Sequence, residues 1–268
     1  MFLEDECTIY IGDLDQLSGT LTVLFNGTTH SIALFDETEI QQFLAGHNSR
    51  FLLDITNIPL AIWAPIIRAC ILGDIKIDIE YSAPTYYWDV LPLNDKEQEV
   101  KSKISTRIEP IHGFGPIFSS EMPQIFVPIL GFQGSRALYL YNAIESKPAY
   151  TFPIITLPGI RPLHYQDALI SNRIFLMRDS IYRQIKHVYV FGYSDTLAYL
   201  QNLSTRFPQC KIRIGLLGPR IQCLAAVVCA SKLPEKFELI YDHPETHTTR
   251  EIVKRKKFQI KFEALNEN

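Results

Sequence analysis

At the start of the chain, short apolar runs alternate with short polar runs. Residues 8–10, 21–25 and 30–34 are β-prone, and turn-forming pairs such as Asn26-Gly27 separate them. Because Asn-Gly favours the tight turn of a β-hairpin, the pattern predicts a short antiparallel β segment at the N-terminus.

A helix and a strand are predicted next. Asp36 precedes an amphipathic stretch over residues 37–45 that Gly46 ends, which is the pattern of a capped helix. The apolar run 51–55 predicts a buried strand. From this run onward, predicted strands and helices alternate.

The following helix and strand carry clear boundary signals. Asn57 is a good N-cap residue, Pro59 suits the first helical turn, and Gly73 ends the helix. In residues 75–81, isoleucines alternate with charged residues, which predicts a strand with one solvated face near a sheet edge.

The second half of the chain begins with a strand, a glycine loop and a helix. The apolar run 125–130 leads into Gly131-Phe-Gln-Gly-Ser-Arg136 and a helix over 137–144, the order with which parallel nucleotide-binding folds begin. Further strands are predicted at 152–157, 187–192, 211–216 and 237–241, and further helices at 165–177, 195–207 and 221–230. This alternation predicts an α/β fold with a Rossmann-like, mainly parallel sheet.

The predicted organisation is two α/β parts joined by an irregular segment. Residues 1–90 form an N-terminal α/β half, 91–122 are a linker or irregular segment, and 123–268 form a C-terminal Rossmann-like half. The stretches 51–84 and 211–244 align without gaps and share two prolines, one tyrosine and one lysine. This leaves open whether the chain contains two related β-α-β halves.

Composition narrows the class of protein. The 268 residues are 47% hydrophobic and 21% charged, enough for a sizeable core, and the net charge of -3 argues against a protein that coats nucleic acid. Five scattered cysteines without a Cys-x-x-Cys pair favour a reducing, cytoplasmic location. No apolar run reaches the roughly 20 residues that a membrane span requires.

The glycine loop is the first candidate ligand site. Gly131, Gly134, Ser135 and Arg136 lie where a phosphate would meet backbone N–H groups and the positive end of a helix dipole. The loop lacks the Gly-Lys-Ser/Thr of a P-loop and the third glycine of the dinucleotide fingerprint. The alternative is therefore that the glycines only make a tight turn.

Two further loops follow predicted strands. Gly218 and Arg220 stand at the start of a helix, where a cation suits an anionic ligand. Arg161 and His164 lie in a loop at the same end of the predicted sheet. The alternatives are that Arg220 pairs with a nearby acid and that the loop 158–164 is a solvated turn.

Asp54, Thr56 and Asn57 connect a predicted strand with a helix, so their side chains are placed to face a ligand's hydroxyl groups or a base edge. This turn resembles, within residues 51–81, the Asp-x-Thr turn of CARF domains, the CRISPR-associated Rossmann-fold sensors of cyclic oligonucleotides. The resemblance implies a Rossmann fold, a nucleotide ligand and a role in prokaryotic antiviral defence. Helix capping by Asp54 and Thr56 is the alternative.

Motifs for catalysis and metal binding are incomplete. Asp242, His243, Glu245 and His247 concentrate potential metal ligands, but Pro244 prevents the register of a His-Glu-x-x-His helix, so no metal site is predicted. The chain has no Gly-x-Ser-x-Gly nucleophile elbow. Catalytic residues and a cofactor are accordingly left unassigned.

Three functions remain open from the sequence. The first is a module that binds a nucleotide or another phosphorylated small molecule and signals to a partner protein or self-associates. The second is an enzyme acting on a nucleotide or sugar phosphate, with Asp54 or His164 as acid or base. The third is a structural subunit of a larger complex that binds no ligand. Nucleic-acid and membrane partners are not expected.

Overall fold

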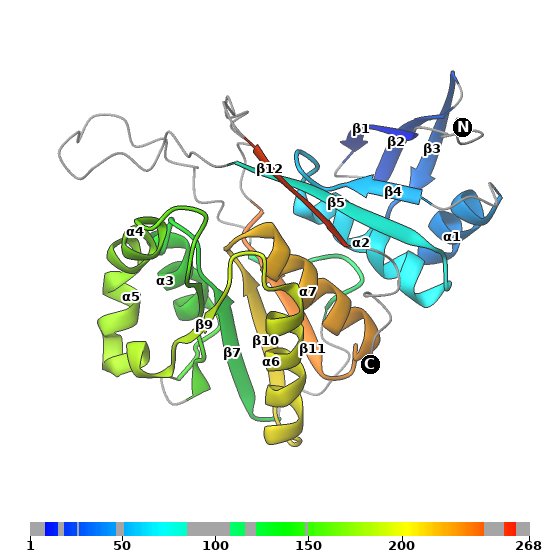
Figure 1. The fold of residues 1–268 in the computed structure, drawn as a ribbon. Coiled ribbons are helices and arrows are strands. Elements are labelled where there is room, and N and C mark those ends of the chain that lie inside the picture. The colour runs from blue at the N-terminus through cyan, green and yellow to red at the C-terminus, as the bar shows by residue number, and fades with distance from the viewer. Residues whose placement is uncertain are drawn as a thin grey trace. The chain divides into compact units, whose positions relative to one another are not determined.

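The computed structural model describes residues 9–15, 19–25, 27–46, 51–84, 108–115, 122–147, 150–243 and 255–260. The chain divides into two compact units: unit 1 is Met1–Glu80 with Ile260–Asn268, and unit 2 is Tyr81–Gln259. Figure 1 shows the elements of both units, coloured along the chain.

Unit 1 begins with the predicted antiparallel β segment. β1 (Ile9–Asp15), β2 (Thr20–Phe25) and β3 (Thr28–Ala33) form one sheet in which β2 pairs with both neighbours. Gly27 lies in the turn between β2 and β3 with φ +77°, a left-handed conformation that glycine adopts at no steric cost. The antiparallel prediction is confirmed.

α1 (Glu37–Ala45) has the predicted boundaries. Asp36 Oδ1 accepts hydrogen bonds from the backbone N–H groups of Thr38 at 2.9 Å and Glu39 at 3.2 Å, and Gly46 follows the last helical residue. The carboxylate thereby satisfies two of the N–H groups that the first helical turn leaves without partners.

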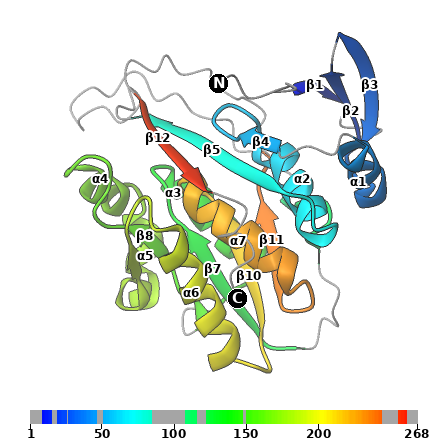
Figure 2. The same cartoon turned by 45° about the vertical axis from the view of Figure 1, so that its right-hand side comes forward.

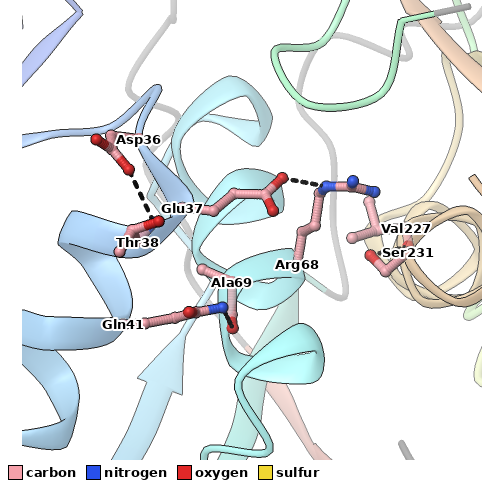
Figure 3. A network of polar contacts seen from close by, with 8 residues as sticks. All are labelled: Asp36, Glu37, Thr38, Gln41, Arg68, Ala69, Val227 and Ser231. Carbon is pink, nitrogen blue, oxygen red and sulfur yellow. Dashed lines mark hydrogen bonds and ion pairs between the residues drawn. The ribbon is translucent and has the colours of Figure 1, made fainter. Parts of the chain in front are cut away.

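Two side-chain contacts join α1 to α2 (Leu60–Leu72) within unit 1, and Figure 3 draws both. Arg68 Nε donates to Glu37 Oε1 at 2.5 Å, and Gln41 Nε2 donates to the carbonyl oxygen of Ala69 at 3.0 Å. Because each contact bridges the two helices, they fix how α1 packs on α2.

α2 connects two parallel strands, β4 (Phe51–Asp54) and β5 (Ile77–Pro84), as predicted. Gly73 ends the helix as expected, but its N-cap is Pro59, so the prediction of Asn57 as N-cap was wrong. Pro59 has φ -55° and ψ 143°, and the helix begins directly after it without a capping side-chain hydrogen bond.

The positions of these two strands in their sheet differ from the prediction, although β5 has the predicted alternation of buried isoleucines with more exposed charged residues. The strand order is β12-β5-β4, with β12 at Arg255–Ile260, so β4 is an edge strand and β5 is central. In β4, half-buried residues alternate with exposed ones, and Leu52 is 57% exposed. The apolar run 51–55 indicated a strand correctly, but its apolar composition did not show that one face is solvated.

Unit 2 is built on a six-stranded, mainly parallel sheet in the order β6-β11-β10-β7-β8-β9. Five of these strands are parallel, and β6 pairs antiparallel with β11. The strands are β6 (Glu109–Pro110), β7 (Gln124–Ile129), β8 (Ile154–Thr156), β9 (Lys186–Val188), β10 (Lys211–Leu216) and β11 (Phe237–Tyr241). The predicted α/β class with a mainly parallel sheet is confirmed.

Helices connect the parallel strands and cover both faces of this sheet. They are α3 (Gly134–Ala143), α4 (His164–Ser171), α5 (Arg173–Met177), the 3-10 segment η2 (Arg178–Gln184) with a kink at Asp179 and Ser180, α6 (Tyr193–Arg206) and α7 (Arg220–Lys232). The single helix predicted over 165–177 is divided at Asn172 into α4 and α5.

The two faces of the sheet carry different kinds of helix. α6 and α7 cover one face (Figures 1 and 2), and residues 221–231 of α7 are all buried, which explains why this helix has no polar side. On the other face, α3 and α5 enclose an apolar cluster that includes Phe126 of β7 and Ile240 of β11. Unit 2 is thus a three-layer α/β structure.

The strand order determines where the connecting loops meet. Counted along the chain, the parallel strands β7, β8, β9, β10 and β11 take the spatial order 3-2-1-4-5. β7 and β10 are neighbours, yet the chain leaves them toward α3 and α7 on opposite faces of the sheet. The carboxyl ends of these two strands are therefore the point at which the winding direction reverses.

Gly134 packs so closely on the end of α4 that an added methyl group would overlap the backbone. A Cβ atom there would lie 2.8 Å from the Cα atom of Asn172 and closer to the Ser171 carbonyl oxygen. We expect Gly134→Ala to lower the free energy of unfolding by about 1–3 kcal/mol, measured by urea denaturation. Gly115→Ala is the control, because its Cβ would meet only Pro110 at 3.8 Å. Equal effects of the two substitutions would contradict the close packing.

Candidate functional site

A pocket in unit 2 lies at the carboxyl ends of four parallel strands. Its lining comes from the ends of β7, β8, β9 and β10 and from β5, and consists of Tyr81, Ala83, Phe132, Thr156, Ile160, His164, Val190, Phe191 and Pro219. Ligands of open α/β sheets bind at this end of the strands, so the position is the expected one for a binding site.

Aromatic rings form two sides of the pocket. Phe132 follows β7 and meets the ring of His164 edge-on, with centroids 5.4 Å apart. Phe191 follows β9 and stacks on Phe258, with centroids 5.4 Å apart and 20° between the planes. The ring positions are therefore held by neighbouring aromatic groups as well as by the backbone.

His164 and Thr156 contribute polar groups to this mainly apolar lining. Both are buried, with 7% and 8% of their surface exposed. The backbone N–H of His164 donates to the carbonyl oxygen of Arg161 at 3.1 Å, which closes the turn before α4. A Cβ on Gly159 would lie 2.7 Å from the Cβ of His164, so glycine lets this turn approach the histidine.

The environment of His164 favours the neutral imidazole. Burial lowers the pKa of His164, the positive charge of Arg161 lowers it further, and the negative charge of Asp167 acts in the opposite direction. Arg161 is exposed while His164 is buried, so a cation stands on the solvent side of the pocket. The neutral ring can donate one hydrogen bond and accept another.

Two helices begin at pocket residues. α4 starts at His164, and the N-cap of α7 is Pro219; neither helix has a capping side-chain hydrogen bond at this end. The backbone N–H groups and the dipole at a helix N-terminus favour negative charge. The electrostatics at this end of the sheet therefore suit an anionic group.

Arg136 does not line this pocket. Its Nε donates to Asp242 Oδ2 at 2.5 Å, its Nη2 donates to Asp242 Oδ1, and its Nη1 donates to Gln133 Oε1 at 2.9 Å. The Asp242 side chain is fully buried at the end of β11, and the guanidinium also lies over the ring of Tyr241. The predicted phosphate contact of Arg136 would thus compete with a buried, bidentate ion pair.

The glycines predicted to cradle a phosphate lie in closely packed backbone. A Cβ on Gly131 would lie 2.5 Å from the carbonyl oxygen of Leu217, and one on Gly218 would lie 3.0 Å from that of Ile129. The loops after β7 and β10 therefore touch each other through their main chains. The buried side chain of Asn172 adds a hydrogen bond of 2.8 Å to the Gly131 carbonyl.

The remaining predicted positions are placed as follows. Ser135 is exposed on the first turn of α3, and Arg220 is half-buried as the first residue of α7. Asp54 Oδ1 accepts hydrogen bonds from the Thr56 backbone N–H at 2.8 Å and from the Thr56 hydroxyl, so these two residues form a local turn rather than a helix cap. Asn57 is exposed. This turn belongs to unit 1, whereas the pocket lies in unit 2.

The residues of the segment 242–247 that could ligate a metal do not form a cluster in the described part of the chain. Asp242 is paired with Arg136, and Glu245 and His247 lie outside the part of the chain that the structure describes. Within the described ranges, no group of three His, Cys, Asp or Glu side chains is placed to hold a metal ion.

Three of the predicted loops do meet at the pocket, but largely through residues that the sequence did not single out. Phe132, Ile160 and Pro219 come from the loops 131–136, 158–164 and 218–220, and His164 is the only predicted site residue in the lining. The missed signal is the apolar character of residues directly after strands, where a loop exposed to water would be polar.

Comparisons of the sequence with protein-family models and with curated proteins, and of the structure with solved structures, find no match. Within the described residues, no helix is long and apolar enough to cross a membrane.

Replacement of Arg136 tests whether its pair with Asp242 is structural. Arg136→Met leaves a fully buried carboxylate without its cation, so we expect the free energy of unfolding to fall by about 3–5 kcal/mol in urea denaturation. The double variant Arg136→Met/Asp242→Leu removes both charges and is expected to recover most of the loss. An Arg136→Met protein as stable as the parent would contradict this role.

The pKa of His164 provides a second test. We expect an NMR titration to place the pKa of His164 below 6.5, and we expect Arg161→Ala to raise this pKa because one positive neighbour is removed. Asp167→Asn is the control, because it removes a negative neighbour and should lower the pKa of His164 further. Since the folded-state pKa lies below the unfolded value, His164 lowers stability as the pH falls below about 6.5, and His164→Gln should remove this part of the pH dependence. A pKa that does not move in either neighbour variant would show that the two charges do not reach the ring.

Proposed function

We propose that unit 2 is a Rossmann-like module that binds an anionic, aromatic small molecule of the nucleotide type. The main observation in support of this proposal is that loops from the carboxyl ends of β7, β8, β9 and β10 line one pocket. Under this proposal the module is a sensor, as the CARF-type resemblance implies: binding changes its affinity for a partner protein. Prokaryotic antiviral defence is the setting that the same resemblance suggests.

The strand order supports the Rossmann-like part of the proposal. The spatial order 3-2-1-4-5 is the one in which dinucleotide-binding folds place their ligand at the reversal point between the first and fourth strands. In this chain, close backbone packing of Gly131 and Gly218 occupies that point. The pocket accordingly lies next to this point, and residues after β7 and β10 line it together with residues from the ends of β8 and β9.

The lining supports a planar aromatic group as the buried part of the ligand. Phe132 and Phe191 offer ring surfaces, and Ile160 and Val190 add aliphatic surface. Rings of this kind stack on a nucleobase, while His164 and Thr156 can hydrogen-bond to its edge. Under this proposal, the base of the ligand contacts these rings.

The charges around the pocket support an anionic group on the same ligand. Arg161 stands at the solvent side of His164, and α4 and α7 direct their N-termini to this end of the sheet. A phosphate attached to a base in the pocket would meet positive potential at its mouth. Under this proposal, Arg161 makes the phosphate contact that the sequence predicted for Arg136.

A β-α-β unit in unit 1 supports the idea of two related halves. α2 and α7 are both 13 residues long, and each follows an extended proline, Pro59 or Pro219, at an offset of 160 residues. β5 and β11 begin at the same offset. Such equal spacing is expected if one unit was duplicated.

An enzyme acting on a nucleotide is the second candidate. The observation in its favour is His164, a buried imidazole whose lowered pKa keeps it neutral near pH 7, as a general base requires. A single assay separates this candidate from the sensor, because only an enzyme converts the ligand.

Thermal unfolding with a ligand panel tests the proposal. We expect adenosine and guanosine mononucleotides, dinucleotides or cyclic oligonucleotides to raise the Tm more than the matching nucleosides, because only the former carry phosphate. Arg161→Ala should weaken binding about tenfold, and Phe132→Ala should weaken nucleosides and nucleotides alike.

The control variant is Arg206→Ala, which removes an exposed arginine at the last residue of α6 and should leave the Tm shift unchanged. Recovery of the bound compound unaltered supports the sensor, and its conversion supports the enzyme. No shift with any compound, or equal losses in Arg161→Ala and Arg206→Ala, would contradict the proposed site and favour a structural subunit.

A further inference from the structure

Consecutive helices α4 and α5 expose an apolar strip to solvent. Ile174 is 66% exposed and Met177 is 68% exposed, and Leu163 and Ile170 continue the strip toward the start of α4. The spacing of seven residues from Leu163 to Ile170 and of three residues from Ile174 to Met177 places each pair on one side of its own helix. The opposite side, with Ala168 and Phe175, is buried.

α4 and α5 meet at Asn172, which is the C-cap of the first helix and the N-cap of the second. The Asn172 N–H donates to the carbonyl oxygen of Ala168 at 3.1 Å, and the Leu176 N–H donates to that of Asn172 at 2.9 Å. The apolar strip therefore passes from one short helix to the next at this residue.

Three arginines lie in α5 and η2, and each donates a hydrogen bond from its guanidinium group to a neutral acceptor. Arg173 donates to the Ile170 carbonyl oxygen at 3.1 Å, Arg178 to Asn142 Oδ1 at 2.7 Å, and Arg183 to the Tyr182 hydroxyl at 3.4 Å. All three residues are exposed. Their charges are thus available to an anionic partner while their geometry is already ordered.

The segment is basic in a chain that is acidic overall. Residues 157–187 contain four arginines and one lysine against two aspartates, an excess of three positive charges, whereas the whole chain carries a net charge of -3. Arginine and methionine beside exposed aliphatic side chains are the composition of protein interfaces.

We propose that the strip Leu163, Ile170, Ile174 and Met177, together with Arg173, Arg178 and Arg183, is a docking surface for an acidic amphipathic helix of a partner protein. Apolar residues of that helix would cover the strip, and its carboxylates would meet the arginines. A second copy of this chain fits less well, because a symmetric contact through this face would bring the same arginines together. This inference does not depend on the ligand of the pocket.

Fluorescence anisotropy with designed peptides tests the docking surface. The probes are labelled helical peptides of about 14 residues with the same apolar i, i+3, i+4, i+7 spacing and with Glu, Gln or Lys at the other surface positions. We expect the Glu peptide to bind at least about tenfold more tightly than the Gln peptide, and its binding to weaken with salt. The Lys peptide should not bind.

Variants of the full chain locate the binding. Ile174→Glu/Met177→Glu should abolish binding of the Glu peptide, and Arg173→Glu should weaken the Glu peptide but not the Gln peptide. Asn202→Glu, at an exposed position of α6, is the control and should leave binding unchanged. Because all of these positions are exposed, an unchanged Tm shows that each variant folds.

Several results would overturn the proposal. They are equal binding of the three peptides, no binding of the Glu peptide, or full binding by Ile174→Glu/Met177→Glu. Two further experiments test other occupants of the surface. If the protein binds vesicles containing phosphatidylserine and Ile174→Glu/Met177→Glu abolishes this binding, the surface contacts a membrane instead. If the protein self-associates in sedimentation velocity and the same variant abolishes this, the surface is a dimer interface.

Discussion

The contact between the loops after β7 and β10 is the constraint on which unit 2 depends. β7 is the first parallel strand and the central one, and the chain must leave it and its neighbour β10 toward opposite faces of the sheet. Both loops therefore turn within the width of adjacent strands, and only glycine at 131 and 218 lets their main chains come so close. The pocket lies beside this contact, where Phe132 and Pro219 from these two loops meet His164 and Phe191 from the loops after β8 and β9.

Close packing and phosphate binding make the same demand on a sequence. Both favour a backbone without a Cβ atom at the turn from a strand into a helix. The sequence could therefore identify the loop 131–136 as special but could not distinguish the two uses. The partner of Arg136 distinguishes close packing from phosphate binding. That partner, Asp242, is 106 residues away along the chain. Local sequence carries no information about such a pairing.

Features that depend on neighbouring residues were predicted well. The Asp36 cap, the glycines that follow the last residues of α1 and α2, and the alternation of strands and helices all follow from local hydrogen bonding and periodicity. Features that depend on sheet assembly were not. The apolar run 51–55 reads as a buried strand, yet β4 lies at an edge with Leu52 exposed. The pocket also depends on sheet assembly, since Phe132 after β7 and Phe191 after β9 line one pocket only because the strand order brings their loops together.

α4 is the element that the pocket and the proposed docking surface share. His164, its first residue, lines the pocket, and Ile170, near its last turn, belongs to the apolar strip. A ligand can change the affinity for a partner only by binding two arrangements of the protein unequally. In unit 2 the candidate for such a change is the position of α4, whose first turn packs on the pocket and whose end carries Asn172, the residue that holds Gly131. A movement of α4 would disturb that hydrogen bond and the contact of Gly134 with Ser171, so the packing that closes the reversal point would also set the free-energy cost of moving this helix.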